Sequence, residues 1–318
     1  MSVGDSSVDT LGSGMDRTVF LINARARLGR LAEIAVAEAL ARRGWHLDRT
    51  VRVRRPGRLS KTVASLVAEG VDRLIVGGGD GTLSTVAAHL AERHISLGVI
   101  PLGTANDFAR TLEIPRQLTA AAAIAAGTHF REIDLAQANG EYFLNVASIG
   151  LSVSTTSLLS FRLKRWLGPA AYSVAGALAF ARHPTFWARI NTPGGAAEGM
   201  VHQVVIGNGR FYGGGVLVAT HSTLEDGMLD VYTLGMRGRW QLLRTMALLR
   251  FKVPLKRPGD VFMRSPTAFV ETRPTGKRVN LDGEIRTRTP VTFTLVRKAL
   301  RVLTPEPDSP EAKEGAMA

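Results

Sequence analysis

The chain has 318 residues, which predicts about two domains at roughly 150 residues each. Hydrophobic residues make up 45% and charged residues 21% of it, which excludes disorder along the whole length. It has no cysteine, so disulfides, thiol catalysis and iron–sulfur clusters are excluded. The overall net charge is +13, and residues 1–16 and 304–318 each carry a net charge of −3, so residues 17–303 carry +19. The positive charge of residues 17–303 predicts an anionic partner: nucleotide, nucleic acid or an acidic membrane surface.

The sequence shows no targeting or membrane-spanning segment. The first 16 residues lack the basic start and the apolar stretch of a secretory signal. The longest apolar candidate, Pro169–Ala181, is too short to cross a bilayer. We therefore expect a cytoplasmic protein, soluble or peripherally associated with a membrane, with disordered tails over 1–16 and 304–318.

Strands and helices alternate up to about residue 134. Each apolar run of strand type is followed by a helical pattern, and two of the helices are closed by a glycine. This alternation predicts a parallel sheet with helices on both faces. The expected strands are Thr18–Asn23, Leu47–Val53, Asp72–Val76 and Ser96–Ile100, and the expected helices are Leu31–Arg43, Lys61–Glu69 and about Leu83–Arg93.

The pattern changes after Asp134. Short alternating runs separated by Gly-rich turns predict a β-rich second domain over 135–287, with helical excursions near 157–182 and 238–251. The expected strand runs are Tyr142–Ala147, Ala188–Asn191, His202–Ile206, Asp230–Leu234, Ala268–Thr272 and Val291–Val296.

Two polar, glycine-bearing segments follow consecutive strands of the predicted sheet. The first reads GGGDGT over 77–82, and its glycines and helix start would form a cradle for an anion. Asp80 would repel a bare phosphate, so it implies a cation or an oriented hydroxyl. The second reads PLGTANDFA over 101–109, at the edge of the sheet where ligands bind in such folds. The alternative is that these residues only turn the chain and cap helices.

Two Asp-Gly pairs lie in the second domain. Asp282-Gly283-Glu284 could bring a carboxylate to a reacting hydroxyl, either as a general base or to position it. We favour Glu284 as the base because its side chain is longer, with Asp282 holding a cation or bracing the turn. Asp226-Gly227 is the second pair. For both pairs the alternative is a surface hairpin turn, for which Asp-Gly is a strong signal.

GGGDGTLS followed by GVIPLGTANDFAR resembles the diacylglycerol kinase catalytic domain, in particular the bacterial lipid kinases of the YegS type. NAD kinases share GGDGT, whereas PLGTANDFA separates the lipid-kinase branch. The resemblance covers essentially residues 17–303. It implies an α/β nucleotide domain over 17–134, a β-sandwich lipid-substrate domain, and a last strand (288–303) that returns to the first domain.

The resemblance also implies a set of site residues. The catalytic carboxylates fall on Asp282 and Glu284, with Asp80 organising the cation or the base. A structural Mg²⁺ site maps to Asp226, with Thr223 and Met228 as carbonyl donors. Contacts with ATP are implied for Asn23, for Gly78, Gly79, Asp80, Gly81, Thr82, Leu83 and Ser84, and for Thr104.

The first loop departs from the family pattern. It reads Asn23-Ala-Arg-Ala-Arg-Leu-Gly29, where the family often has NPxSG, so Arg25 and Arg27 replace small residues and could contact phosphates. A family Thr near the end of the second strand is missing, and its gapless equivalent is about Val53. Both changes concern nucleotide contacts and leave open whether nucleotide preference is altered.

Two basic, apolar stretches could lie on a membrane. They are Phe161–Leu167 and Arg239–Lys252, the second with apolar residues at helical spacing between arginines. The alternative is that each is an ordinary surface helix. A lipid kinase needs access to a bilayer, which keeps the membrane interpretation open.

The sequence therefore predicts an ATP- and Mg²⁺-dependent lipid kinase that phosphorylates a hydroxyl of a diacylglycerol-like lipid at an anionic membrane surface. It leaves open which lipid, and whether the protein is a homodimer. An NAD kinase and a non-catalytic, nucleotide-sensing membrane module are the alternatives. No nucleic-acid partner is expected, because no recognition motif occurs and aromatic residues are only 6% of the chain.

Overall fold

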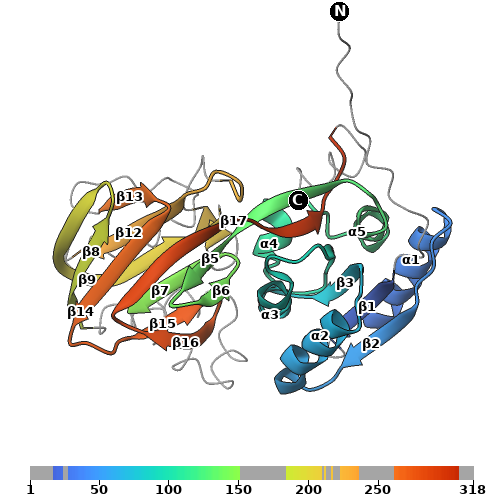
Figure 1. Cartoon of the computed structure of the whole chain (residues 1–318), viewed down its shortest axis with the longest axis horizontal. Coiled ribbons are helices and arrows are strands. Elements are labelled where there is room, and N and C mark those ends of the chain that lie inside the picture. The colour runs from blue at the N-terminus through green and yellow to red at the C-terminus, as the bar shows by residue number, and fades with distance from the viewer. Residues whose placement is uncertain are drawn as a thin grey trace, which may run out of the picture.

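The computed structural model describes residues 17–23, 28–150, 184–209, 211–212, 216–217, 223–235 and 261–307. An α/β part and a β part lie side by side (Figure 1). The stretches predicted to contact a membrane, Phe161–Leu167 and Arg239–Lys252, lie outside the described residues, as do Arg25 and Arg27.

The α/β part contains the predicted parallel sheet. Its four N-terminal strands run in the order β4-β3-β1-β2, so β2 is the edge strand. Helix α1 contacts α5 and helix α2 contacts α3, and the two pairs cover opposite faces of the sheet (Figure 1). The strands are β1 (Thr18–Asn23), β2 (Arg49–Val53), β3 (Arg73–Gly78) and β4 (Ser96–Pro101). The helices are α1 (Gly29–Ala41), η1 (Pro56–Arg58), α2 (Leu59–Ala68), α3 (Asp80–Leu90), α4 (Asp107–Thr111) and α5 (Leu118–Ala125).

The β part is antiparallel and encloses its own hydrophobic core. Its main path runs β16-β15-β7-β9-β8-β14-β17, with β12 pairing both β9 and β13. Its strands are β6 (Glu141–Phe143), β7 (Val146–Gly150), β8 (Phe186–Thr192), β9 (Gly195–Gly207), β10 (Phe211–Tyr212), β11 (Val216–Leu217), β12 (Leu229–Gly235), β13 (Phe262–Ser265), β14 (Thr267–Arg273), β15 (Arg278–Leu281) and β16 (Glu284–Arg288).

Two long strands, β5 (Phe130–Ala138) and β17 (Val291–Leu303), join the two parts. They pair with each other along most of their length, and β17 crosses from the β part into the α/β part (Figure 1). There it pairs in parallel with β4, through Arg301 opposite Ser96 and Val302 opposite Leu97. This confirms the predicted return of the last strand to the first domain.

A break in the pairing of β17 with β5 lies at the junction of the two parts. The register shifts between Val296 and Leu300, and Lys298 has a positive φ of 51°. Buried Asp134 on β5 holds this bend, because its Oδ1 accepts the backbone N–H of Lys298 at 2.8 Å. The other oxygen of Asp134 accepts the N–H of Gly227 at 2.9 Å. One carboxylate therefore fixes both the bend and a loop of the β part.

The structure differs from the sequence predictions at two elements near this junction. Helix α3 begins at Asp80 and not near Leu83, so the DGT of the glycine loop forms its first turn. The single run predicted over Tyr142–Ala147 is two strands, β6 and β7, which are interrupted at Leu144 and Asn145. The interruption at Leu144 and Asn145 has no Gly or Pro to signal it, and the N–H groups of both residues donate to Asp282, which is far away in the sequence.

Tyr142 on β6 contacts the end of α3 across the junction. Its hydroxyl donates to Glu92 Oε1 at 2.5 Å, and burial, followed by this hydrogen bond, raises the pKa of Tyr142 to about 12 from 10.0. A raised pKa means that the folded state keeps a proton that the unfolded state releases. The stabilisation is therefore complete below pH 10.0 and is lost as the pH rises towards about 12.

We expect the free energy of unfolding of wild type to fall between pH 10.0 and about 12 relative to that of Tyr142→Phe, which has no titrating group there. Urea unfolding of both proteins across this range measures the difference. A difference that does not change with pH would contradict the assignment.

Among the described residues, no helix is long and apolar enough to cross a membrane.

Candidate active site at the junction of the two parts

The two glycine-bearing loops of the α/β part touch through their glycines. Gly79 follows β3 and Gly103 follows β4, and a Cβ added to Gly103 would lie 2.6 Å from the Cα of Gly79 and 2.7 Å from Asn106 Oδ1. Asn106, in the left-handed conformation, ties its own loop together by accepting from the N–H of Gly103 and donating to its carbonyl, both at 2.9 Å. The contact leaves no room for a side chain between the loops.

We expect Gly103→Ala to destabilise the protein by about 1–3 kcal/mol, because the added methyl forces the loops apart. The matched control is Gly81→Ala, which has nothing within 4 Å of the added Cβ and lies in the first turn of α3. That change should stabilise the helix by about 0.5–1 kcal/mol. Urea unfolding measures both, and equal stability of the two variants would contradict this account.

Asp80 and Asp107 stand at the starts of the two helices that follow these loops. Asp80 Oδ1 accepts the N–H of Phe108 at 3.0 Å, so it links α3 to the start of α4. The side chain of Asp107 is 8% exposed and forms an ion pair with Arg110 at 3.3 Å. The first N–H groups of a helix lack partners within it, so the start of α3 beside Gly79 can bind an anion.

The other predicted nucleotide contacts lie at the same edge of the sheet with different exposures. Thr82 is buried against Gly78, and Leu83 is fully buried in the core, so Leu83 can offer a ligand only its backbone. Asn23 ends β1 directly opposite Val53. Thr104 is exposed, and its carbonyl accepts Arg116 Nη2 at 2.7 Å.

The segment Leu281–Glu284 is a two-residue hairpin turn between β15 and β16. Asp282 and Gly283 have φ of 48° and 98°, as a type I′ turn requires, so the predicted turn is present. It does not project into solvent, however. Both oxygens of the Asp282 carboxylate accept hydrogen bonds, from Ser84 Oγ at 2.7 Å and from three consecutive N–H groups, those of Leu144, Asn145 and Val146, at 2.7–3.0 Å.

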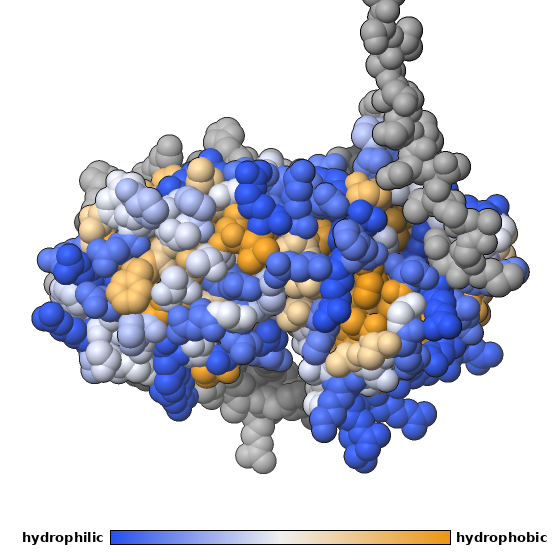
Figure 2. All heavy atoms as spheres, viewed as in Figure 1, coloured by the Kyte–Doolittle hydropathy of each residue, from blue (hydrophilic) through white to orange (hydrophobic). Residues whose placement is uncertain are grey.

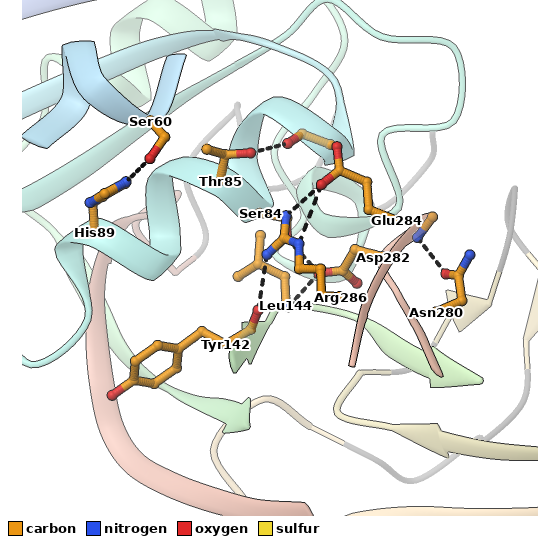
Figure 3. A network of polar contacts seen from close by, with 12 residues as sticks. Ser60, Ser84, Thr85, His89, Tyr142, Leu144, Asn280, Asp282, Glu284 and Arg286 are labelled. Carbon is orange, nitrogen blue, oxygen red and sulfur yellow. Dashed lines mark hydrogen bonds and ion pairs between the residues drawn. The ribbon is translucent and has the colours of Figure 1, made fainter. Parts of the chain in front are cut away.

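Asp282 therefore fastens the hairpin to α3 and to the break between β6 and β7 (Figure 3). Burial raises the pKa of its carboxyl group, and the hydrogen bonds from the backbone and from Ser84 oppose the rise. With its oxygens committed to four donors, this carboxylate braces the turn. No local pattern points to these partners, since Ser84 is 198 residues away from Asp282 in the sequence.

Glu284, two residues on, has a side chain that is 63% exposed. Arg286 lies beside it on β16 and donates to Glu284 Oε2 from Nη2 at 3.0 Å, while Nη1 donates to the carbonyl of Tyr142 at 3.4 Å (Figure 3). No sequence pattern pointed to Arg286, although residues two apart on a strand, such as Glu284 and Arg286, lie on the same face. Because Ser84 holds the turn against α3, this exposed carboxylate stands next to the first turn that follows the glycine loop.

The three predicted metal residues, Asp226, Thr223 and Met228, lie together in one loop. The carboxylate of Asp226 accepts the N–H groups of Thr223 at 3.0 Å and Met228 at 2.9 Å, and it pairs with Arg264 at 2.6 Å. Arg264 also pairs with buried Asp230 at 3.0 Å. In this structure the positive charge beside Asp226 is a guanidinium, and the Mg²⁺ site with the carbonyls of Thr223 and Met228 stays a prediction. Among the described residues, no three acidic or histidine side chains gather as a metal site.

Two family models match the chain on either side of the junction. The model for the diacylglycerol kinase catalytic domain matches residues 17–138, and the model for the YegS C-terminal NAD kinase beta sandwich-like domain matches residues 145–304. The chain belongs to the diacylglycerol kinase family. The resemblance seen in the sequence is confirmed, and so is the class of enzyme, a kinase.

Relatives and solved structures of this family match nearly the whole chain. A "Probable lipid kinase YegS-like" from Pseudomonas fluorescens is 38% identical over 282 residues, 87% of this chain and 91% of the relative. One of the same description from Pseudomonas aeruginosa is 35% identical over 295 residues, 92% of this chain and 96% of the relative. The structure of a "putative diacylglycerol kinase" from Bacillus anthracis str. Sterne has a TM-score of 0.78 at 25% identity, covering 93% and 98% of the two chains.

Proposed function

We propose that this diacylglycerol kinase family member transfers the γ-phosphoryl group of MgATP to a hydroxyl of a diacylglycerol-like lipid. One observation carries the proposal: Asp282 and Ser84 hold the exposed carboxylate of Glu284 next to the first turn of α3. An acceptor hydroxyl near Glu284 and a phosphate on the glycine loop would then be neighbours. Phosphoryl transfer depends mainly on such positioning and on charge stabilisation.

The glycine loop, Asp80 and Glu284 have different roles in the proposed reaction. The loop of Gly78 and Gly79 and the start of α3 bind the phosphates of MgATP, with Asn23 and Thr104 at the rim. Mg²⁺ enters with the nucleotide as part of the substrate, and Asp80 is placed to orient it. The lipid oxygen forms a bond to the γ-phosphorus while the bond from that phosphorus to the bridging oxygen of ADP breaks. Glu284 accepts the hydroxyl proton.

Arg286 supports this step as a positioning residue. It contacts one oxygen of Glu284 and the carbonyl of Tyr142, so it fixes the direction of the carboxylate.

The test is a labelled-ATP assay with the purified full chain, Mg²⁺ and a panel of acceptors. Diacylglycerol, phosphatidylglycerol, ceramide and a sphingoid base each offer a hydroxyl, and NAD is included because NAD kinases share the GGDGT element. We expect a phosphorylated lipid. Phosphorylation of NAD alone, or nucleotide binding without any phosphorylated product, would overturn the proposal.

A further inference from the structure

Four exposed cations gather where the edge strand β2 ends and α2 begins. We call Arg54, Arg55, Arg58 and Lys61 the cationic edge. No hydrogen bond or ion pair of these four side chains is found within the part of the chain that the structure describes. The nearby acids are already engaged, since Glu69 pairs with Arg49 and Glu33 pairs with Arg52.

The cationic edge does not stabilise the helix that follows it. Arg58 is the residue before the first turn of α2, Lys61 lies in that turn, and the turn contains no acidic residue. Cations at the positive end of a helix are unfavourable. These charges therefore cost stability in the absence of a partner, and a partner of opposite charge would remove the cost.

Three exposed apolar side chains lie at the start of α1. Leu28, Leu31 and Ile34 are 48%, 56% and 49% exposed, and they follow one another at three-residue intervals along the start of α1. We call them the apolar ridge. The ion pair between Glu33 and Arg52 ties this end of α1 to the end of β2, so the start of α1 and the cationic edge lie at the same end of the sheet.

Both features lie at the ligand-binding edge of the sheet. Val53, the last residue of β2, is directly opposite Asn23, the last residue of β1, so Arg54 leaves the sheet at the same edge as the glycine loops. Apolar and hydrophilic side chains both lie on the surface of the α/β part (Figure 2). Exposed apolar groups flanked by Lys and Arg are the composition of surfaces that sit at the water–lipid interface.

We propose that the cationic edge and the apolar ridge form a docking surface for an anionic lipid bilayer. The cations contact lipid headgroups, while Leu31 and Ile34 enter the boundary between headgroups and acyl chains. Docking in this way brings the bilayer to the edge of the sheet at which the phosphate loops open. The purpose of the surface rests on the proposed lipid kinase function, but its test does not require activity.

The experiment measures binding of the full chain, without nucleotide, to vesicles of phosphatidylcholine with or without phosphatidylglycerol. The test variant is Arg54→Gln/Arg55→Gln/Arg58→Gln. Its matched control is Arg42→Gln/Arg43→Gln/Arg93→Gln, which removes three exposed cations at the C-terminal ends of α1 and α3, the opposite edge of the sheet. A second pair compares Leu31→Ser/Ile34→Ser with Met200→Ser, an exposed apolar residue of the β part.

Each cation near an anionic surface contributes about 1 kcal/mol, so the test triple should bind phosphatidylglycerol vesicles on the order of a hundredfold more weakly than wild type. The control triple should lose far less, and the Leu31→Ser/Ile34→Ser variant should bind more weakly than Met200→Ser. Equal losses in the two triples would mean that only net charge matters and would overturn the proposal. So would a dimer in light scattering that Leu31→Ser/Ile34→Ser dissociates, because a second copy would then cover the ridge.

The lipid kinase assay separates this proposal from the proposed function. The test triple should still phosphorylate lipid presented in detergent micelles, where docking on a bilayer is not needed. If wild type phosphorylates lipid while the test triple binds vesicles normally, the docking surface is wrong and the function stands. If vesicle binding falls as expected while wild type makes no phospholipid product, the function is wrong and the docking surface stands.

Discussion

Glu284→Gln is expected to lower kcat by about 10²–10⁴-fold and to leave the KM for ATP nearly unchanged, because it removes the proton acceptor and keeps the shape of the side chain. Glu284 is exposed beside the start of α3, and Arg286 holds its direction. The nucleotide loops lie on other elements and should bind ATP as before. Steady-state kinetics with varied ATP and varied lipid measure the two parameters separately.

The matched control is Glu141→Gln, an exposed glutamate on β6 with no role in the proposed reaction. It should retain the activity of wild type. If Glu284→Gln keeps more than about a tenth of the wild-type turnover, the loss is smaller than general-base catalysis is typically worth, and the base lies elsewhere. Asp107 is then the next carboxylate to test, although it is buried and paired with Arg110.

Asp282→Ala should destabilise the protein by about 3–5 kcal/mol, the largest loss of stability that we expect from a single change outside the cores. It leaves three part-buried backbone N–H groups and the Ser84 hydroxyl without an acceptor, and each costs about 1 kcal/mol, the lower end of the cost of a buried unsatisfied group. Urea unfolding measures the loss, with Glu141→Ala as a control that should stay within about 0.5 kcal/mol of wild type.

A double-mutant cycle with Ser84→Ala identifies the cause. The two changes share one hydrogen bond, so the double variant should lose less stability than the sum of the single variants. Asp282→Asn keeps the shape of the side chain. Its kcat should stay within about tenfold of that of wild type, a smaller loss than removal of a general base causes. A kcat loss in Asp282→Asn as large as that of Glu284→Gln would instead make Asp282 the catalytic group.

Local patterns in the sequence were sufficient for the sheet of the α/β part and for the residues at its ligand edge. The apolar run at Thr18–Asn23 matches β1 at both ends, and GGGDGT lies at the end of β3 as predicted. These features depend on neighbouring residues, so periodicity and glycine placement reveal them.

The sequence favoured Glu284 over Asp282 as the base through the reach of its side chain alone. The donors that hold Asp282, on α3 and at the break after β6, lie far away in the sequence and could not be predicted. In the same way, no local pattern predicted the ion pair of Asp226 with Arg264, because Arg264 comes from another strand. A sequence pattern identifies which residues could act, and the tertiary structure decides which of them are free to act.

The return of β17 to β4 has a consequence for the order of folding during synthesis. Ala299, Leu300 and Val302 are buried in the core of the α/β part, which otherwise comes almost entirely from residues 19–144. That core stays incomplete, and β4 keeps an open edge, until β17 has left the ribosome. Open strand edges are prone to pair with other chains. A nascent chain stopped before β17 should therefore aggregate, and the α/β part expressed alone should need residues 291–303 supplied as a separate peptide to become soluble.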